Sequence, residues 1–241
     1  MRWALTLLAT LPVLLGACEE ESVPLSGNTD VVSQIPWAAT EIVRYRLLSG
    51  DDIVGSGELR LRPDGDERII LDQRFEFPDE GITDTVSVVA DADTLRPLSA
   101  DRLIDGPEGI RRCEAKYKAN AVTVDQKSKD SERTDKLDLP PTFYDTWSDL
   151  FLWRSLAFAE GFEVRYADVL SCSLAKPDLL TIVLKVKRVE SVTVPAGTFD
   201  AWRLEIRSGG ETQKAWYADD EARTLVRYDN GDLVFELESS E

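Results

Sequence analysis

The stretch Gly57-Glu58-Leu59-Arg60-Leu61-Arg62, followed by Pro63-Asp64-Gly65, decides the fold class of this chain. Its apolar and charged residues alternate, as they do in a β-strand with one face in water. Pro-Asp-Gly then predicts a tight turn, and the return segment 69–77 again places apolar residues on one side. We therefore expect a β-hairpin over residues 57–77.

The same period of two continues from residue 40 to the C-terminus. The last expected strands, 225–228 and 233–237, flank Asp229-Asn230-Gly231-Asp232, in which Asn-Gly accepts the positive φ of a tight hairpin turn. Evenly spaced short strands favour an antiparallel sheet, so we predict a mainly β fold, a curved antiparallel sheet or half-barrel. The other expected strands lie near residues 82–88, 95–104, 109–117, 119–126, 131–138, 162–170, 179–194, 202–207 and 211–219.

Residues 142–161 break the β pattern. Pro140-Pro141 ends the preceding strand, Thr142 is a good N-cap, and apolar residues recur at helical spacing until Gly161. We expect one amphipathic helix packed on the concave face of the sheet. Its aromatic side chains leave two interpretations open, a plug that fills the core or the lining of an apolar ligand pocket. The candidate lining residues are Phe143, Trp147, Phe151 and Phe158.

Composition removes several functional classes. The chain has 241 residues and a net charge of −17, from 45 acidic and 28 basic side chains, so it repels the phosphate backbone of nucleic acids. It contains no histidine, the usual base of nucleophilic triads and a common metal ligand. Its short acidic pairs, such as Asp91-Ala92-Asp93, lack calcium-loop spacing. We predict no enzymatic activity, no cofactor, no metal site and no nucleic-acid partner.

The N-terminus has the pattern of a secretory signal. Arg2 precedes an uncharged run, residues 3–17, that is too short to span a bilayer as a helix. Its end, Leu15-Gly16-Ala17-Cys18, resembles the bacterial lipobox, in which a peptidase cuts before a lipidated cysteine. The resemblance implies a lipoprotein signal peptide over residues 1–17 and lipid attachment at Cys18. The alternative is ordinary cleavage after Ala17 that leaves Cys18 free.

Residues 18–37 are expected to form the lipidated cysteine and a flexible acidic tether, followed by a single β-rich domain over residues 38–241. The tether region is acidic and then contains Ser, Gly and Asn, with little periodic hydrophobicity before Pro36. The alternative is that Val31, Val32 and Ile35 begin a strand.

Cys113 and Cys172 each lie in an expected strand of a chain bound for an oxidising space. A disulfide that closes so long a loop would stabilise the fold by about 3–5 kcal/mol. The alternative is two separate, buried and inert thiols. Their separation does not follow from the sequence, so both interpretations stay open.

The segment 192–199, which contains Val-Pro-Ala-Gly-Thr-Phe, and Ala215-Trp216-Tyr217 resemble the C-terminal signature of a large family of exported bacterial proteins of unknown function. The likeness covers about residues 38–240. Pro195 and Gly197 are explained by turn chemistry, so the motif marks a fold and not a site. The family is similar in general look to the LolA-like lipoprotein-carrier architecture, which implies a lipophilic cavity.

These patterns predict a lipid-anchored envelope protein that binds or carries an apolar ligand. The alternative is a protein-interaction scaffold at the outer membrane, with a filled core and no small-molecule ligand. The expected partners are the membrane, through the N-terminal lipid, and a lipophilic ligand or an envelope protein. Glu19 replaces the aspartate associated with inner-membrane retention, which favours the outer membrane, facing the periplasm.

Overall fold

The computed structural model describes residues 31–241, which form one 15-stranded sheet, one short α-helix and two 3-10 turns. Neighbouring strands are antiparallel apart from the parallel pair β9 and β10. The strands are β1 (Glu41–Ser49), β2 (Asp52–Pro63), β3 (Arg68–Phe77), β4 (Ile82–Asp91), β5 (Pro97–Asp105), β6 (Arg111–Lys118), β7 (Ala121–Lys127), β8 (Glu132–Asp138), β9 (Tyr144–Asp145), β10 (Glu163–Leu170), β11 (Asp178–Val194), β12 (Gly197–Ser208), β13 (Glu211–Ala218), β14 (Leu225–Asp229) and β15 (Val234–Ser240).

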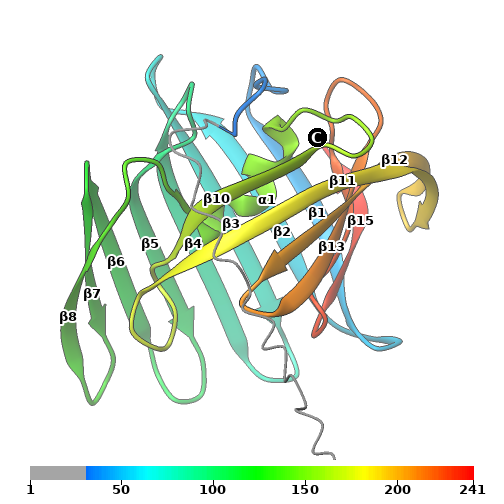
Figure 1. Cartoon of the computed structure of the whole chain (residues 1–241). Helices are drawn as coiled ribbons and strands as arrows, with labels where there is room; N and C mark the ends of the chain where they lie inside the picture. Colours follow the sequence, from blue (N-terminus) through cyan, green and yellow to red (C-terminus); the bar gives the residue numbers. More distant parts are fainter. Residues whose placement is uncertain (1–30) are drawn as a thin grey trace, which may run out of the picture.

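The sheet curls so that its two halves face each other. Pairing of β1 with β15 joins the N-terminal half, β1 to β8, to the C-terminal half, β9 to β15. Figure 1 shows β10, β11 and β13 crossing in front of β2 to β5, with the α-helix between the layers. Strands β8 and β9 are the two edges, so the described strands form a curved, open sheet. The predicted mainly β fold with a curved antiparallel sheet is confirmed.

The hairpins predicted from alternation are present. In β2, Leu59 and Leu61 are buried while Arg60 between them is exposed, which places one face on the core. The closing turn uses Gly231 at φ +96°, and the Asn230 side chain accepts hydrogen bonds from two following backbone amides, including that of Leu233 at 2.8 Å. Local turn chemistry and the period of two therefore act together here.

The helix expected over residues 142–161 is wrong in its extent. Only α1 (Asp149–Leu152) is α-helical, between 3-10 turns η1 (Thr146–Ser148) and η2 (Trp153–Ser155). The Ser148 hydroxyl donates to the carbonyl of Asp145 at 2.8 Å, and the Ser155 hydroxyl donates to the carbonyl of Leu152 at 2.6 Å. Such side-chain bonds compete with the regular helical ladder. The segment lies on the concave face as expected, but as one helical turn within an irregular plug (Figure 1).

The expected tether is also partly wrong, because residues 31–37 pack on the domain. Val31 and Trp37 are buried. The backbone amides of Ser33 and Gln34 both donate to the carbonyl of Ser155, at 2.8 and 3.1 Å. The segment therefore belongs to the folded unit, although it forms no strand. The predicted signal peptide, Cys18 and the rest of the tether lie outside the described residues.

Candidate functional site

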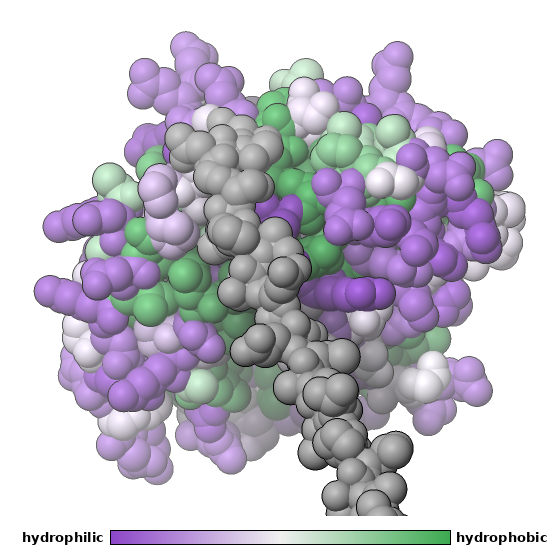
Figure 2. Space-filling view, in the orientation of Figure 1, coloured by the Kyte–Doolittle hydropathy of each residue, from purple (hydrophilic) through white to green (hydrophobic). Residues whose placement is uncertain are grey.

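A cleft of about 470 Å³ opens between the two halves of the sheet. Its floor is the η1–α1–η2 segment, one wall comes from β3 to β5, and the other comes from β10 to β15. On the face of the molecule seen in Figure 2, hydrophobic residues lie to both sides of the middle and hydrophilic residues predominate toward the margins. The apolar lining residues include Phe75, Phe77, Trp147, Leu150, Trp153, Leu170, Leu180, Ile182, Ile206, Leu233 and Phe235.

Of the four aromatic residues suggested as ligand lining, the structure places Trp147 alone in this cleft. Phe143 is buried and stacks on Tyr117 with ring centroids 5.6 Å apart. Phe151 is 2% exposed and belongs to the core. Phe158 packs against other rings, including that of Tyr217 at 5.9 Å. The plug and pocket interpretations therefore each describe part of the segment, because the irregular backbone turns these side chains in different directions.

Three carboxyl groups lie beneath the cleft, where burial makes charge costly. Asp145 of β9, Asp149 of α1 and Asp168 of β10 are at most 5% exposed. The hydroxyl of Thr146 donates to Oδ2 of Asp168 at 2.5 Å, and the hydroxyl of Tyr166 donates to Oδ1 of Asp149 at 2.8 Å. Asp149 and Asp168 line the cleft directly. The floor thus combines apolar surface with buried acid groups.

The side chain of Asp145 connects three parts of the structure beneath the cleft through hydrogen bonds. Its Oδ1 accepts a hydrogen bond from the backbone amide of Trp147 at 2.8 Å, which caps the first 3-10 turn. Its Oδ2 accepts from the hydroxyl of Ser171 at 2.7 Å and from the hydroxyl of Tyr117. One carboxyl group therefore joins β6, the η1 turn and the segment after β10.

Burial raises the pKa of all three carboxyl groups, because it disfavours the charged form. For Asp168, burial and the nearby Asp145 outweigh the opposing effects of the Thr146 hydroxyl and the Val169 backbone amide and raise the pKa to about 7. For Asp149, burial and the charge of Asp168 raise the pKa well above its usual range, despite the Tyr166 hydroxyl. The cluster therefore keeps protons at pH values where an exposed aspartate is ionised.

Arg102 is the cation among the described residues that line the cleft, and three of its five N–H groups donate hydrogen bonds within the protein. It forms a two-pronged ion pair with Asp84, at 3.0 and 2.6 Å, and each partner is 14% exposed. Its Nη1 also donates to the carbonyl of Cys172 at 2.8 Å. The guanidinium lies over the ring of Trp147, 4.2 Å from the centroid, so it fixes that ring as well.

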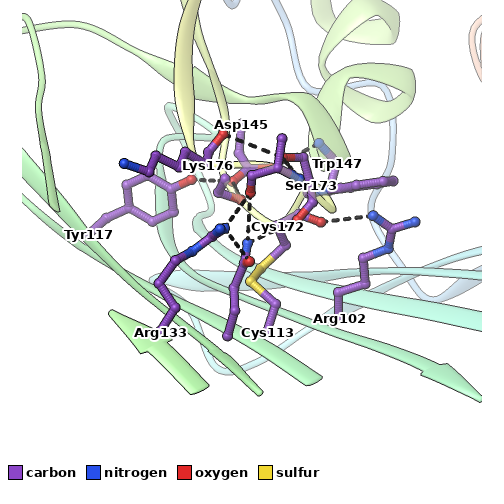
Figure 3. Close-up of a disulfide and its surroundings, with 12 residues drawn as sticks. Arg102, Cys113, Tyr117, Arg133, Asp145, Trp147, Cys172, Ser173 and Lys176 are labelled. Atoms are coloured by element: carbon purple, nitrogen blue, oxygen red, sulfur yellow. Dashed lines mark hydrogen bonds between the residues drawn. A yellow bond between two sulfur atoms is a disulfide. The ribbon is translucent and has the colours of Figure 1, made fainter. Parts of the chain in front are cut away.

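The two cysteines that the sequence left open are joined by a disulfide, with their Cα atoms 5.6 Å apart. Figure 3 shows this bond beside Arg102, which donates to the Cys172 carbonyl. The amide of Gln126 donates to the carbonyl of Ser173 at 2.9 Å. The bond and these contacts tie the segment between β10 and β11 to β6 and β7 at one end of the cleft.

Within residues 31–241, no group of three or more His, Cys, Asp or Glu side chains is placed to hold a metal ion. No helix in the same range has the length and hydropathy needed to cross a membrane.

Sequence reasoning missed the buried acids. Alternation from Val164 and Tyr166 places Asp168 on the inward face and Ala167 on the outward face with Arg165, yet residues 166–169 are all buried. This part of β10 is covered beyond the simple alternation, since β9 pairs with it along its edge and η1 contacts it. A weak signal existed, because a lone acid inside an otherwise apolar run such as Ala167-Asp168-Val169-Leu170 is unusual for an exposed strand.

A family model described as a protein of unknown function, DUF3108, matches residues 54–238. A crystal structure of a beta-barrel-like protein, a domain of unknown function DUF1849 from Brucella abortus, resembles this chain with a TM-score of 0.59. The two share 14% sequence identity over 84% of this chain and 97% of that chain. This likeness concerns the fold.

Two further solved structures are more distant. A candidate lipoprotein from Parabacteroides distasonis has a TM-score of 0.31 and 13% identity, over 88% of this chain and all of that chain. A candidate exported protein with a YmcC-like fold from Bacteroides fragilis has a TM-score of 0.28 and 13% identity, over 87% of this chain and 99% of that chain. No curated protein matches the chain.

Proposed function

The chain belongs to the DUF3108 family of unknown function, and we propose that it is a non-catalytic, lipid-anchored protein of the bacterial envelope that binds an apolar ligand. The observation that carries this proposal is the cleft of about 470 Å³ whose two facing walls are rich in apolar side chains. Its volume falls in the range of about 300–1,000 Å³ typical of small-molecule sites.

The architecture supports ligand occlusion. Leu180 and Ile182 from β11 face Phe75 and Phe77 from β3 across the cleft. A hydrocarbon chain placed between them would therefore be shielded from water on both sides. Burial of apolar surface is favourable by about 25 cal/mol per Å². In this respect the fold would work like the LolA-like carriers, in which a curved sheet shelters a lipophilic cargo.

The envelope location is supported by the sequence at the N-terminus and by the cysteines. Residues 3–17 and Cys18 have the signal and lipobox pattern, and lipidation there would hold the domain at a membrane surface. The disulfide between Cys113 and Cys172 fits an oxidising space such as the periplasm. We place the anchor in the outer membrane because Glu19 follows the cysteine.

The proposal favours binding over catalysis because the cleft offers no activated nucleophile. The chain contains no histidine, and the hydroxyls of Thr146 and Tyr166 donate to Asp168 and Asp149, whose burial favours the protonated form that cannot act as a base. Arg102 is held by Asp84 and a carbonyl. These groups form a fixed polar floor that suits recognition.

A second candidate function, a protein-interaction scaffold at the outer membrane, is supported by one edge of the sheet. Among residues 31–241, strand β8 pairs with β7 alone, and its other side would be the place for a strand from a partner. Under this alternative, the aromatic segment is filled core, as Phe143 and Phe151 already are, and the cleft holds no ligand.

Binding of the neutral fluorescent probe N-phenyl-1-naphthylamine tests the first function. The chain from residue 19 onward contains every described residue and is the suitable form. Leu180→Gln and Leu233→Gln, at partly buried positions in the cleft, should each weaken probe binding at least fivefold. Ile53→Gln is the matched control, since Ile53 is 62% exposed and lies outside the cleft. Equal binding by all variants, or none by the wild type, would favour the scaffold.

A further inference from the structure

Two residues that line the cleft each carry a buried polar atom without a hydrogen-bond partner among residues 31–241, namely Oδ1 of Asp168 and Nε1 of Trp147. Asp168 is completely buried, and both atoms are out of contact with solvent. A buried polar group without a partner costs about 1–3 kcal/mol, so such groups call for an explanation.

Both groups are held in place by other bonds. Oδ2 of Asp168 accepts from the hydroxyl of Thr146 at 2.5 Å, which leaves Oδ1 as the oxygen without a partner. The Trp147 backbone is fixed on both sides, because its amide donates to Asp145 at 2.8 Å and its carbonyl accepts from Gln73. Its ring is covered by Arg102. The two groups are therefore preorganised, which lowers the entropic cost of binding.

The charges around the cleft select the kind of head group. The acidic residues that line it are Asp84, Asp149, Asp168 and Glu211, against Arg102 as the cation among the described lining residues. The charge of Arg102 is balanced by Asp84, and three of its five N–H groups already donate to Asp84 and to the carbonyl of Cys172. A carboxylate or phosphate placed beside Asp168 would meet like charge in a poorly solvated site whenever Asp168 is ionised.

We propose that the cleft binds a neutral amphiphile whose head group both donates and accepts hydrogen bonds, a hydroxyl or an amide, placed against Oδ1 of Asp168 and Nε1 of Trp147. Its hydrocarbon chain lies along the apolar walls. This inference rests on the proposed function and adds the chemistry of the ligand's polar end. Indole N–H is a donor only and a carboxylate is an acceptor only, so a head group with both functions matches the pair.

The protonation of Asp168 is compatible with such a ligand. Burial raises the pKa of Asp168 to about 7, so the carboxyl group exists in both forms near neutral pH. The ionised form accepts from a hydroxyl, and the protonated form also donates to one. A neutral head group is therefore bound in either state, whereas an anionic one is repelled by the ionised form.

Three amphiphiles with the same twelve-carbon tail test the inference. Each is used at pH 8 to displace N-phenyl-1-naphthylamine that is bound to the protein beginning at residue 19. The three amphiphiles are 1-monolauroylglycerol, with two hydroxyls, laurate, an anion, and dodecyltrimethylammonium, a cation without donors. We expect monolauroylglycerol to bind at least tenfold more tightly than laurate and more tightly than the cation. Equal affinity for all three overturns the inference but leaves apolar binding intact.

Two variants test the named atoms. Trp147→Phe keeps an aromatic ring under Arg102 and removes the N–H, so it should weaken monolauroylglycerol about fivefold. Asp168→Asn removes the charge and should shrink the preference over laurate. The control is Trp216→Phe, because the indole of Trp216 donates to Glu190 outside the cleft. Unchanged selectivity in both cleft variants overturns the inference, and failure to bind both the probe and every amphiphile overturns it together with the proposed function.

Discussion

Replacement of Asp168 by Asn should raise the free energy of unfolding at pH 8 and reduce its dependence on pH between pH 5 and 7. In the folded protein the pKa of Asp168 is raised from 3.8 to about 7, mainly by burial. Between these values the folded chain holds a proton that the unfolded chain has released, so stability falls as the pH rises. The loss begins above pH 3.8, accumulates to about pH 7 and is complete above it.

The size of the effect follows from the same values. The slope for one proton is about 1.4 kcal/mol for each pH unit, so ionised Asp168 costs the fold about 4 kcal/mol above pH 7. Between pH 5 and 8 the cost accumulates to about 3 kcal/mol. Asn is nearly isosteric and neutral, and its side-chain oxygen still accepts from the Thr146 hydroxyl. The variant should therefore lose this contribution while it keeps the local bond.

Other groups contribute to the pH dependence of the wild type. The pKa values of Asp145 and Asp149 are also raised by burial, so these groups act in the same direction. The pKa values of Asp91 and Glu205 are lowered, by the Thr94 hydroxyl for Asp91 and by Lys187 for Glu205, against the opposing effect of burial. Their stabilisation is lost only as the pH falls below about 4.

Urea denaturation at pH 5, 6, 7 and 8 measures the difference between the wild type and Asp168→Asn, which removes contributions common to both proteins, such as the repulsion from a net charge of −17. The stability gained by the variant should grow by about 3 kcal/mol from pH 5 to pH 8. Asp51→Asn, at an exposed position, is the matched control. If the free energies of unfolding of the wild type and Asp168→Asn changed in parallel with pH, the reasoning would be refuted.

Two further perturbations test the framework that surrounds the cleft. The disulfide closes a loop with a sequence separation of 59, so its removal with Cys113→Ser and Cys172→Ser should lower the free energy of unfolding by about 4 kcal/mol. Urea denaturation measures this change, and an unchanged midpoint would contradict a structural role for the bond. Gly55→Ala should lower the free energy of unfolding by several kcal/mol, because a Cβ there would clash with the carbonyl oxygen of Glu76, whereas Ser56→Ala at the exposed neighbour should not. Equal free energies of unfolding for the two variants would show that the strands move apart to admit the methyl group.

The β framework could be predicted because its signals are local. Alternation in Gly57–Arg62 and the Asn230-Gly231 turn each follow from side chains within a few residues, and the structure has strands and turns at both places. The order of strands, with β1 beside β15, depends on contacts between the two ends of the domain. No local pattern encodes such a pairing, although it brings the two walls of the cleft together.

The plug was predicted as a helix because its apolar spacing resembles one. The spacing is real, but Ser148 and Ser155 bond to preceding carbonyls, and residues 31–37 pack against the same segment. These contacts come from distant parts of the chain and override the helical preference. The same limit explains the tether, because the amides of Ser33 and Gln34 find their acceptor only once the Ser155 carbonyl is in place.

An apolar lining from the aromatic segment could be predicted from the sequence, but most of the lining residues could not. Trp147 lines the cleft as expected of an apolar pocket, whereas Phe143 and Phe151 are core. Asp149 and Asp168 were not expected there, since their burial depends on how β9 and β10 meet. Polar groups that determine ligand selectivity are therefore the part of this site that depends most on tertiary structure.

Native mass spectrometry of the chain from residue 19 onward, purified from the periplasm of a bacterial host, tests the central claim most directly. The native mass should exceed the denatured mass by a reproducible increment of lipid size, and Leu180→Gln should reduce the fraction that carries it. Equal native and denatured masses for the wild type would contradict ligand binding in the cleft and leave the scaffold as the better account.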